Sequence, residues 1–304
     1  MSLNRRHVMA AIGAGAVVGW AGTGWSATEM TLGTARLTTL SDGHLTLPRD
    51  FLLGDLDPEK ADPILAKHGI TGDMIRPPCN LTLYRDGTHT VLFDAGAGST
   101  FMPSAGDLRG ALDTAGVAAG DITHVLFTHA HPDHLWGVLD DFDELRFANA
   151  THMIGQAEWD YWTDPDTVDT IGEERASFAV GAARRLAAIE DIVEHIGDGQ
   201  EVLPGIMAHA SFGHTPGHMS FEIRQGSEAV MVVGDAIGNG HLALVRPDWP
   251  SGADQDPETG IATRLRLLDH LATEGMPLVG FHLPDGGLGR IERADGAYRF
   301  VTEV

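Results

Sequence analysis

The sequence predicts an α/β fold in which strands and helices form layers around shared cores. Near the N-terminus, short runs with apolar residues at alternate positions are separated by Asp-Gly pairs, as in β-hairpins. Farther along, segments with helical spacing of apolar residues alternate with short β-branched runs. Hairpins first, and then strands mixed with helices, favour one layered domain over separate units.

The individual elements follow from these patterns in chain order. Two hairpins are expected before residue 95, and their strands are 36–40 with 44–47, and 81–84 with 89–93. Helical spacing predicts helices at 108–118, 156–162, 173–190 and 257–274. Further strands are expected at 122–127, 206–210, 220–224, 228–233 and 278–281, and a last hairpin pairs 289–292 with 298–301.

The composition of the chain indicates which kinds of molecule it binds. The chain has 304 residues and a formal net charge of −23, and a surface that acidic repels the phosphates of nucleic acids. We therefore expect a small-molecule substrate and no nucleic acid. Cys79 is the only cysteine, so the chain can form neither an intramolecular disulfide nor a zinc site with several thiolates. The sequence also holds 16 histidines, and their positions become the main question.

The N-terminus has the pattern of an export signal. Arg5 and Arg6 precede an apolar run from Met9 to about Gly22, and small residues follow to Ala27. The paired arginines resemble the signal of the bacterial twin-arginine system. The run is shorter than the roughly 20 apolar residues of a spanning helix. We expect residues 1–27 to be a twin-arginine-type signal peptide and 28–304 to be the mature domain, periplasmic or secreted, without stable membrane insertion.

A dense group of metal-binding residue types follows the strand predicted at 122–127. His129, His131, Asp133 and His134 lie within six residues. In extended chain, alternate side chains point to the same side, so His129 and His131 can reach one ion. Pro132 turns the chain, which lets the next two residues reach a neighbouring position. Imidazole and carboxylate suit zinc, although iron, manganese or cobalt also accept them.

This run resembles the His-x-His-x-Asp-His motif of the metallo-β-lactamase superfamily. The resemblance implies an αββα sandwich, with later ligands that each adjoin an apolar strand. In the expected order these are His218 in Gly213-His-Thr-Pro-Gly-His218, Asp235 after Val232-Val-Gly, and His282 after Val279-Gly-Phe. His214 is expected to pack in the loop without binding metal. Asp94 resembles a superfamily aspartate that orients metal ligands, although it equally fits a turn cap.

The resemblance also implies an activity. Two divalent metal ions, expected to be zinc, would hold a bridging hydroxide that attacks an ester, lactone or phosphoester. Asp133 would be a ligand and also orient that water or carry its proton. Segments 94–98, 203–206 and 213–218, with the ending 289–301, are most similar to methyl parathion hydrolase and its exported relatives. Those enzymes have an aromatic pocket, which would be formed here by Phe101, Trp162 and Phe178.

Other functions remain open at this point. A quorum-quenching lactonase is one, although the tyrosine usual near the metals of such enzymes has no clear counterpart. A mononuclear iron oxygenase resembling persulfide dioxygenase would use a subset of the same ligands. A non-catalytic metal-binding scaffold is disfavoured by the complete ligand set, and ribonuclease Z is disfavoured by export and acidity. A homodimer is left open.

Overall fold

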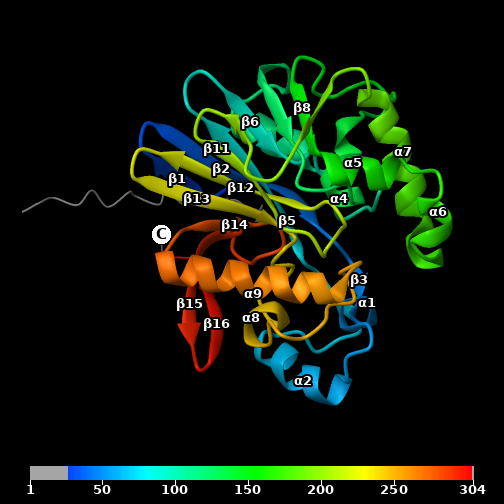
Figure 1. Ribbon diagram of the computed structural model, residues 1–304, viewed down its shortest axis with the longest axis vertical. Coiled ribbons are helices and arrows are strands. Elements are labelled where there is room, and N and C mark those ends of the chain that lie inside the picture. Colours follow the sequence, from blue (N-terminus) through cyan, green and yellow to red (C-terminus); the bar gives the residue numbers. More distant parts are fainter. Residues whose placement is uncertain (1–26, 303–304) are drawn as a thin grey trace, which may run out of the picture.

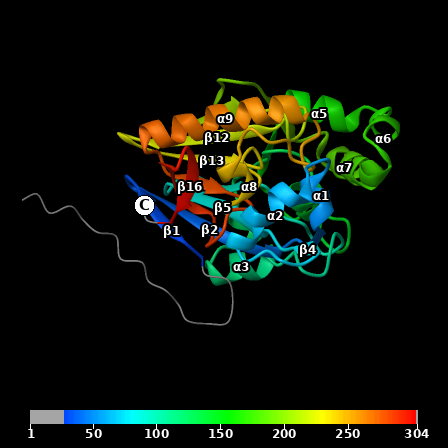
Figure 2. The ribbon, with the colours of Figure 1, turned by 90° about the horizontal axis from the view of Figure 1, so that it is seen from below.

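Two seven-stranded sheets pack face to face, and helices cover their outer faces (Figures 1 and 2). The structure is a computed structural model that describes residues 27–302, so the predicted signal peptide lies outside the described residues except for Ala27. The arrangement is the αββα sandwich that the resemblance implied, and this prediction is confirmed.

The strands follow one another in this spatial order. The first sheet contains β1 (Glu29–Leu32), β2 (Ala35–His44), β5 (Pro78–Arg85), β6 (Thr90–Phe93), β7 (His124–Leu126), β8 (Thr151–Gly155) and β9 (Val193–Ile196). The second contains β10 (Glu201–Leu203), β11 (Ile206–Ala210), β12 (Met219–Gln225), β13 (Glu228–Gly234), β14 (Leu278–Gly280), β15 (Leu288–Ala294) and β16 (Ala297–Val301). A separate pair consists of β3 (Leu47–Pro48) and β4 (Met74–Ile75).

Three apolar cores correspond to the layers. Between the sheets, Phe93 of β6 lies against Phe221 of β12, with ring centroids 5.4 Å apart. A second core joins the outer face of the first sheet to its helices, and a third joins the second sheet to the long helix α9 (Pro257–Glu274). Figure 2 shows α9 above the second sheet and α3 (Leu108–Thr114) below the first. The helices are α1 (Arg49–Leu53), α2 (Pro58–Lys67), α3 (Leu108–Thr114), α4 (Pro132–Leu135), α5 (Gln156–Thr163), α6 (Thr167–Thr170), α7 (Ala176–Ile189), α8 (Leu242–Val245) and α9 (Pro257–Glu274).

Of the two hairpins expected before residue 95, one is confirmed and one is wrong. Strands β5 and β6 pair in antiparallel register across the Asp-Gly turn as predicted. The Asp-Gly pair at Asp42 and Gly43 instead lies inside the single strand β2, at a shift in its register against β5. Gly43 has φ +95°, and a Cβ there would meet the Ser104 carbonyl oxygen at 2.3 Å. The glycine therefore permits a bulge against a neighbouring loop and not a turn.

Residues 47–75, which we call the cap segment, contain β3, α1, α2 and β4, and sequence patterns did not predict these elements. Its apolar side chains, including Leu52, Leu65 and Ile75, form a small core with Leu242 of α8. Helix α2 begins at Pro58, and the Asp57 side chain accepts the Glu59 N–H at its N-terminus. The segment therefore has its own anchoring contacts and forms a wall beside the sandwich.

The sheet topology brings the loops with the metal-binding residue types together. Strands β6 and β7 are parallel neighbours in the first sheet, and β13 and β14 are parallel neighbours in the second. The carboxyl ends of parallel strands lie at one edge of a sheet, where ligands bind in open α/β structures. The loops that carry Asp94, His129, Asp235 and His282 each begin at such an end.

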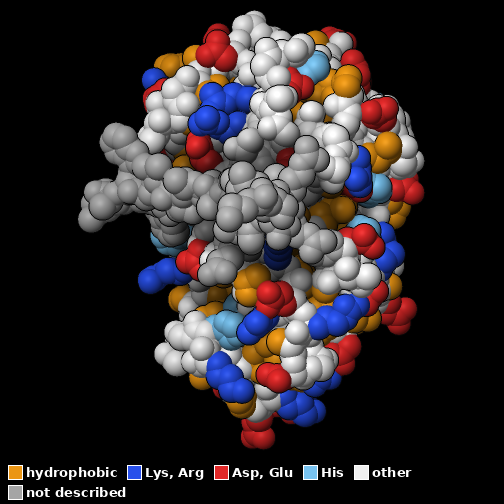
Figure 3. All heavy atoms as spheres, turned by 90° about the vertical axis from the view of Figure 1, so that its left-hand side faces the viewer, with side chains coloured by type: hydrophobic (Ala, Val, Ile, Leu, Met, Phe, Trp, Pro, Cys, Tyr) orange, Lys and Arg blue, Asp and Glu red, His pale blue; other side chains and the backbone are white. Residues whose placement is uncertain are grey.

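Charged groups of both signs lie on one face of the molecule. On the part of the face in Figure 3 that grey atoms do not cover, Lys and Arg lie scattered among Asp and Glu. Among residues 27–302, no helix combines the length and apolarity needed to cross a bilayer.

The first testable prediction concerns Asp42, a fully buried carboxylate that accepts the N–H groups of Ala97 at 2.7 Å and Leu108 at 2.6 Å. Burial raises the pKa of Asp42 from 3.8 to about 7. Between these two values the folded protein keeps a proton that the unfolded chain releases, so the free energy of unfolding falls as pH rises. Asp42→Asn removes this titration. Between about pH 4 and pH 8, urea unfolding should therefore show the free energy of unfolding of the variant rising by about 4 kcal/mol relative to that of wild type. A difference that is constant with pH would contradict the prediction.

Candidate metal centre

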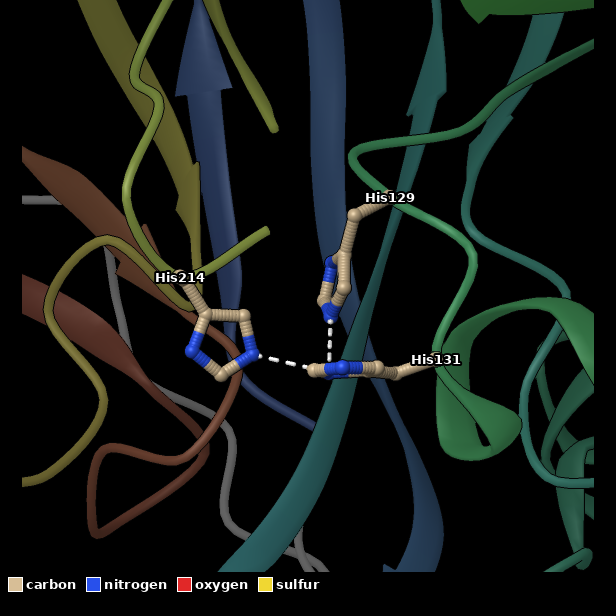
Figure 4. Close-up of side chains that lie close together, drawn as sticks. All are labelled: His129, His131 and His214. Atoms are coloured by element: carbon tan, nitrogen blue, oxygen red, sulfur yellow. Dashed lines mark hydrogen bonds between the residues drawn. The ribbon is translucent and has the colours of Figure 1, made fainter. Parts of the chain in front are cut away.

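Three histidines from two loops point their ring nitrogens at one another (Figure 4). His129 and His131 follow β7, and His214 comes from the loop between β11 and β12. His131 Nδ1 lies 3.0 Å from His129 Nε2 and 2.9 Å from His214 Nε2. A neutral imidazole has one N–H group and one nitrogen with a free lone pair. When the N–H groups point outward, the lone pairs of the three inward nitrogens face a common point. These three residues could hold one metal ion.

A second group lies beside the first. Asp133 and His134 are in α4, and His282 follows β14 in the other sheet. Asp133 Oδ2 lies 3.3 Å from His282 Nε2 and 3.6 Å from His134 Nε2. Pro132 occupies the first position of α4, so the helix starts inside the histidine motif and directs the next two side chains away from His131.

Asp235, which follows β13, lies between the two groups. Its Oδ2 is 3.4 Å from His214 Nε2 in the first group and 3.2 Å from His282 Nε2 in the second, and its Oδ1 is 3.3 Å from His134 Nε2. One carboxylate therefore reaches both groups, as a bridging ligand between two ions would.

Several polar atoms of this centre are buried without a hydrogen bond. They are Asp133 Oδ2, His134 Nε2 and Asp235 Oδ1. Buried polar groups in proteins are almost always paired, because an unpaired one loses its hydration without compensation. Oxygen and nitrogen atoms that converge without hydrogen bonds to one another fit divalent cations such as zinc.

The electrostatics of the centre also fit cations. Burial disfavours the charged form of His282, but Asp235 and Asp133 outweigh it and raise its pKa to about 10. Burial also lowers the pKa of His134, but the nearby carboxylates outweigh it and raise that pKa well above its ordinary value. These carboxylates are Asp235, Asp94 and Asp133. Burial lowers the pKa of His129 and His131, which keeps both rings neutral and able to bind metal. The two carboxylates thus attract positive charge into the centre.

The outer nitrogen of each of the five histidines is held by another group. Asp94 Oδ2 lies 2.8 Å from His134 Nδ1, so this aspartate orients the ring and is more than a turn cap. Asp254 Oδ1 lies 3.3 Å from His214 Nδ1 and is itself paired with Arg264 at 3.2 Å. The remaining contacts are Thr128 Oγ1 to His129 Nδ1 at 3.1 Å, the Gln255 amide to His131 Nε2 at 3.2 Å, and the Pro78 carbonyl oxygen to His282 Nδ1 at 2.7 Å.

Glu158 joins the two loops that supply the first group. This fully buried residue of α5 accepts the Ala130 N–H at 2.8 Å, between His129 and His131. Its other oxygen accepts the Thr215 hydroxyl at 2.7 Å and the Gly217 N–H at 3.0 Å, in the loop that carries His214. The motif patterns did not reveal this role, because Glu158 lies in an ordinary helical stretch far from either loop in sequence.

The sequence assignment of the third histidine needs correction. It took His218 as the ligand and His214 as a loop-packing residue, and the structure places them the other way round. His218 Nδ1 lies 2.8 Å from Ser211 Oγ, and its Nε2 accepts the backbone N–H of Asp235 at 3.0 Å. Both ring nitrogens are therefore used, and His218 holds the backbone of Asp235. The two histidines share one sheet edge, so only the path of the loop decides which ring faces His131.

A cavity of about 510 Å³ opens over both groups. Phe101 and Phe178 line it, with ring centroids 6.0 Å apart. Trp162, the third predicted pocket aromatic, does not line it, and that prediction is wrong. Its Nε1 donates to Glu158 at 2.6 Å, and its ring centroid lies 5.7 Å from that of His131. Trp162 thus supports His131 from behind.

The corrected assignment generates the second prediction. His214→Ala should reduce bound metal by about one ion per chain, because it removes one of three donors of the first group. His218→Ala should retain both ions but lower the free energy of unfolding by about 1–3 kcal/mol, because buried partners lose their hydrogen bonds. Metal content after dialysis and urea unfolding of both variants would check this. The reverse pattern would restore His218 as the ligand.

Comparison with known proteins agrees with this geometry. A family model for the metallo-beta-lactamase superfamily matches residues 74–276. The structure of AidC, a dizinc quorum-quenching lactonase, has a TM-score of 0.86 and 26% identity, and the match covers 91% of this chain and 97% of that one. The hydrolase AbOPH has a TM-score of 0.86 and 25% identity, with 93% and 99% covered.

A curated relative matches over a shorter stretch. The N-acyl homoserine lactonase AttM of Azorhizobium caulinodans is 31% identical over 112 residues, which is 36% of this chain and 38% of that protein. The family match covers most of the chain, and the sandwich fold and the motif from His129 to His134 agree with it. The chain belongs to the metallo-beta-lactamase superfamily.

Proposed function

We propose that this hydrolase binds two divalent metal ions and opens lactones or related carboxylic esters. The observation that carries the proposal is the pair of donor groups joined by Asp235, with buried ligand atoms that make no hydrogen bond. His129, His131 and His214 would hold one ion. Asp133, His134 and His282, which lie within 3.6 Å of one another through Asp133 Oδ2, would hold the other. When bound, such ions lower the pKa of water at the site and polarise a carbonyl or phosphoryl oxygen.

Asp133 is the residue best placed to handle a proton. It lines the cavity, and its Oδ2 is buried without a hydrogen bond. In hydrolysis it would orient the attacking water and carry a proton to the departing oxygen. No serine or cysteine nucleophile is required, because water attacks the substrate directly.

The cavity supports a substrate with an apolar acyl part. Leu45, Phe51, Phe101 and Phe178 line it beside the polar residues of the centre. A mostly apolar wall with a few convergent polar groups is the usual form of a small-molecule site. The similarity to a dizinc quorum-quenching lactonase and to an N-acyl homoserine lactonase supports lactones within this class.

Phosphotriesters are a second candidate, supported by the motif resemblance to methyl parathion hydrolase. Phe101 and Phe178, which meet edge to face on the cavity wall, would suit an aryl leaving group. A parallel screen of an N-acyl homoserine lactone, an aryl ester and a phosphotriester would rank the candidates. If each chain instead holds one iron ion and hydrolyses none of these three substrates, the oxygenase alternative is favoured.

The third prediction concerns Asp133. Asp133→Asn keeps the size of the side chain but removes the group that accepts the proton. With metal occupancy matched to wild type, turnover of the best substrate should fall by about 10²–10⁴-fold. Thr163→Val, at an exposed position of α5, is the control and should keep wild-type turnover. Wild-type turnover in fully loaded Asp133→Asn would show that Asp133 serves only as a ligand.

We also propose that the protein is exported by the twin-arginine route to the periplasm or beyond. The support is the Arg5-Arg6 pair ahead of an Ala- and Gly-rich apolar run. As the fourth prediction, Arg5→Lys with Arg6→Lys should leave precursor in the cytoplasm, measured by cell fractionation. Asn4→Gln, beside the pair, is the control. Unchanged export of the double variant would contradict this route.

A further inference from the structure

The loop of residues 238–241 lines the cavity and carries two polar side chains that the proposed chemistry does not use, Asn239 and His241. Each uses its acceptor atom within the protein. Asn239 Oδ1 accepts the backbone N–H groups of His241 at 3.2 Å and Ala243 at 3.0 Å. His241 Nδ1 accepts the N–H of Leu242 at 2.9 Å. Together they hold the start of α8.

These contacts determine which polar atoms remain available. Because the Asn239 oxygen accepts two N–H groups, the amide orientation is defined and Nδ2 points the other way. Because His241 Nδ1 is an acceptor, the neutral ring carries its proton on Nε2. Burial, with a smaller effect of His68, lowers the pKa of His241 to about 4, so the ring is neutral at pH 7. The two side chains therefore offer two donors and no free side-chain acceptor.

Neither donor has a protein acceptor among residues 27–302, and both residues line the cavity. The buried unpaired atoms include both ring nitrogens of His152 but neither Asn239 Nδ2 nor His241 Nε2, so these two are accessible. Asn239 as a whole is nevertheless only 7% exposed, so its amide is largely enclosed. An enclosed donor without an acceptor becomes satisfied when a ligand oxygen reaches it.

The pair lies on the side of the cavity that faces the cap segment. The His241 ring centroid is 5.9 Å from that of His68, at the end of α2, and α8 packs on the cap core through Leu242. The bond to be hydrolysed must instead lie at Asp133 and Asp235. An oxygen bound by the pair therefore belongs to another part of the substrate.

We propose that Asn239 and His241 bind a neutral acceptor oxygen of the substrate that is separate from the bond hydrolysed, such as the amide carbonyl of an N-acyl lactone. The inference rests on the proposed lactone hydrolysis and narrows its substrate class. Two neutral donors suit a carbonyl oxygen, which needs no counter-charge. A plain alkyl lactone would leave both donors unpaired, and a site built to hydrogen-bond a group discriminates against analogues that lack it.

The test compares two lactones with the same ring and chain length, one with the amide carbonyl and one without it. Asn239→Asp keeps the acceptor that holds α8 but lacks the donor. His241→Asn keeps a short acceptor at the start of α8 but withdraws the Nε2 donor. Each variant should lower kcat/KM for the N-acyl lactone by about 5–10-fold, mainly through KM, and change the alkyl lactone by less than about twofold.

The matched control is Thr71→Val, an exposed position at the cavity rim, which should leave the ratio between the two lactones unchanged. The alkyl lactone and the metal content report whether each variant is folded and loaded. Equal losses on both lactones, or an unchanged ratio in both variants, would overturn the inference while lactone hydrolysis stands. Wild-type protein that hydrolyses neither lactone would overturn the proposed function and the inference with it.

Discussion

The burial of Asp133 and Asp235 among five histidines is the constraint on which the rest of the site depends. Two carboxylates removed from water are strongly unfavourable unless positive charge lies beside them. Protonated imidazoles supply part of this positive charge. The two carboxylates accordingly raise the pKa of His282 to about 10 against the effect of burial. Divalent ions would supply it more fully and release those protons. The same groups that would bind metal are therefore those that are hardest to bury without it.

A shell of neighbouring contacts holds these groups in place. Every ring in the two donor groups has its outer nitrogen against an oxygen or an amide, so the inward nitrogens are oriented before any ion arrives. Glu158 connects the loops of His129 and His214 through a single buried carboxylate. His218 holds the backbone of Asp235. Residues without a direct role in chemistry thus determine the spacing of those that have one.

The cavity combines parts of the chain with different tasks. The sandwich supplies the centre at the carboxyl ends of parallel strands, where the ligand loops converge. The cap segment and α8 supply the apolar wall, and the loop after Asp235 adds neutral donors between them. A substrate that spans this space would meet the reacting groups at one end and a recognition surface at the other. Changes in the cap segment could therefore alter specificity while the centre remains intact.

The sequence by itself determined the fold class, most strands and helices, and six of the seven residues that converge. Local signals were sufficient there: period-two and helical spacing define the elements, and the run from His129 to His134 is too dense to be incidental. Only the tertiary structure decided between His214 and His218, because both lie at one sheet edge and the loop path sets which ring faces His131. It also showed Asp42 inside a strand, Trp162 behind the cavity, and Glu158 between two loops. Each of these depends on contacts between residues far apart in the chain, which no local pattern records.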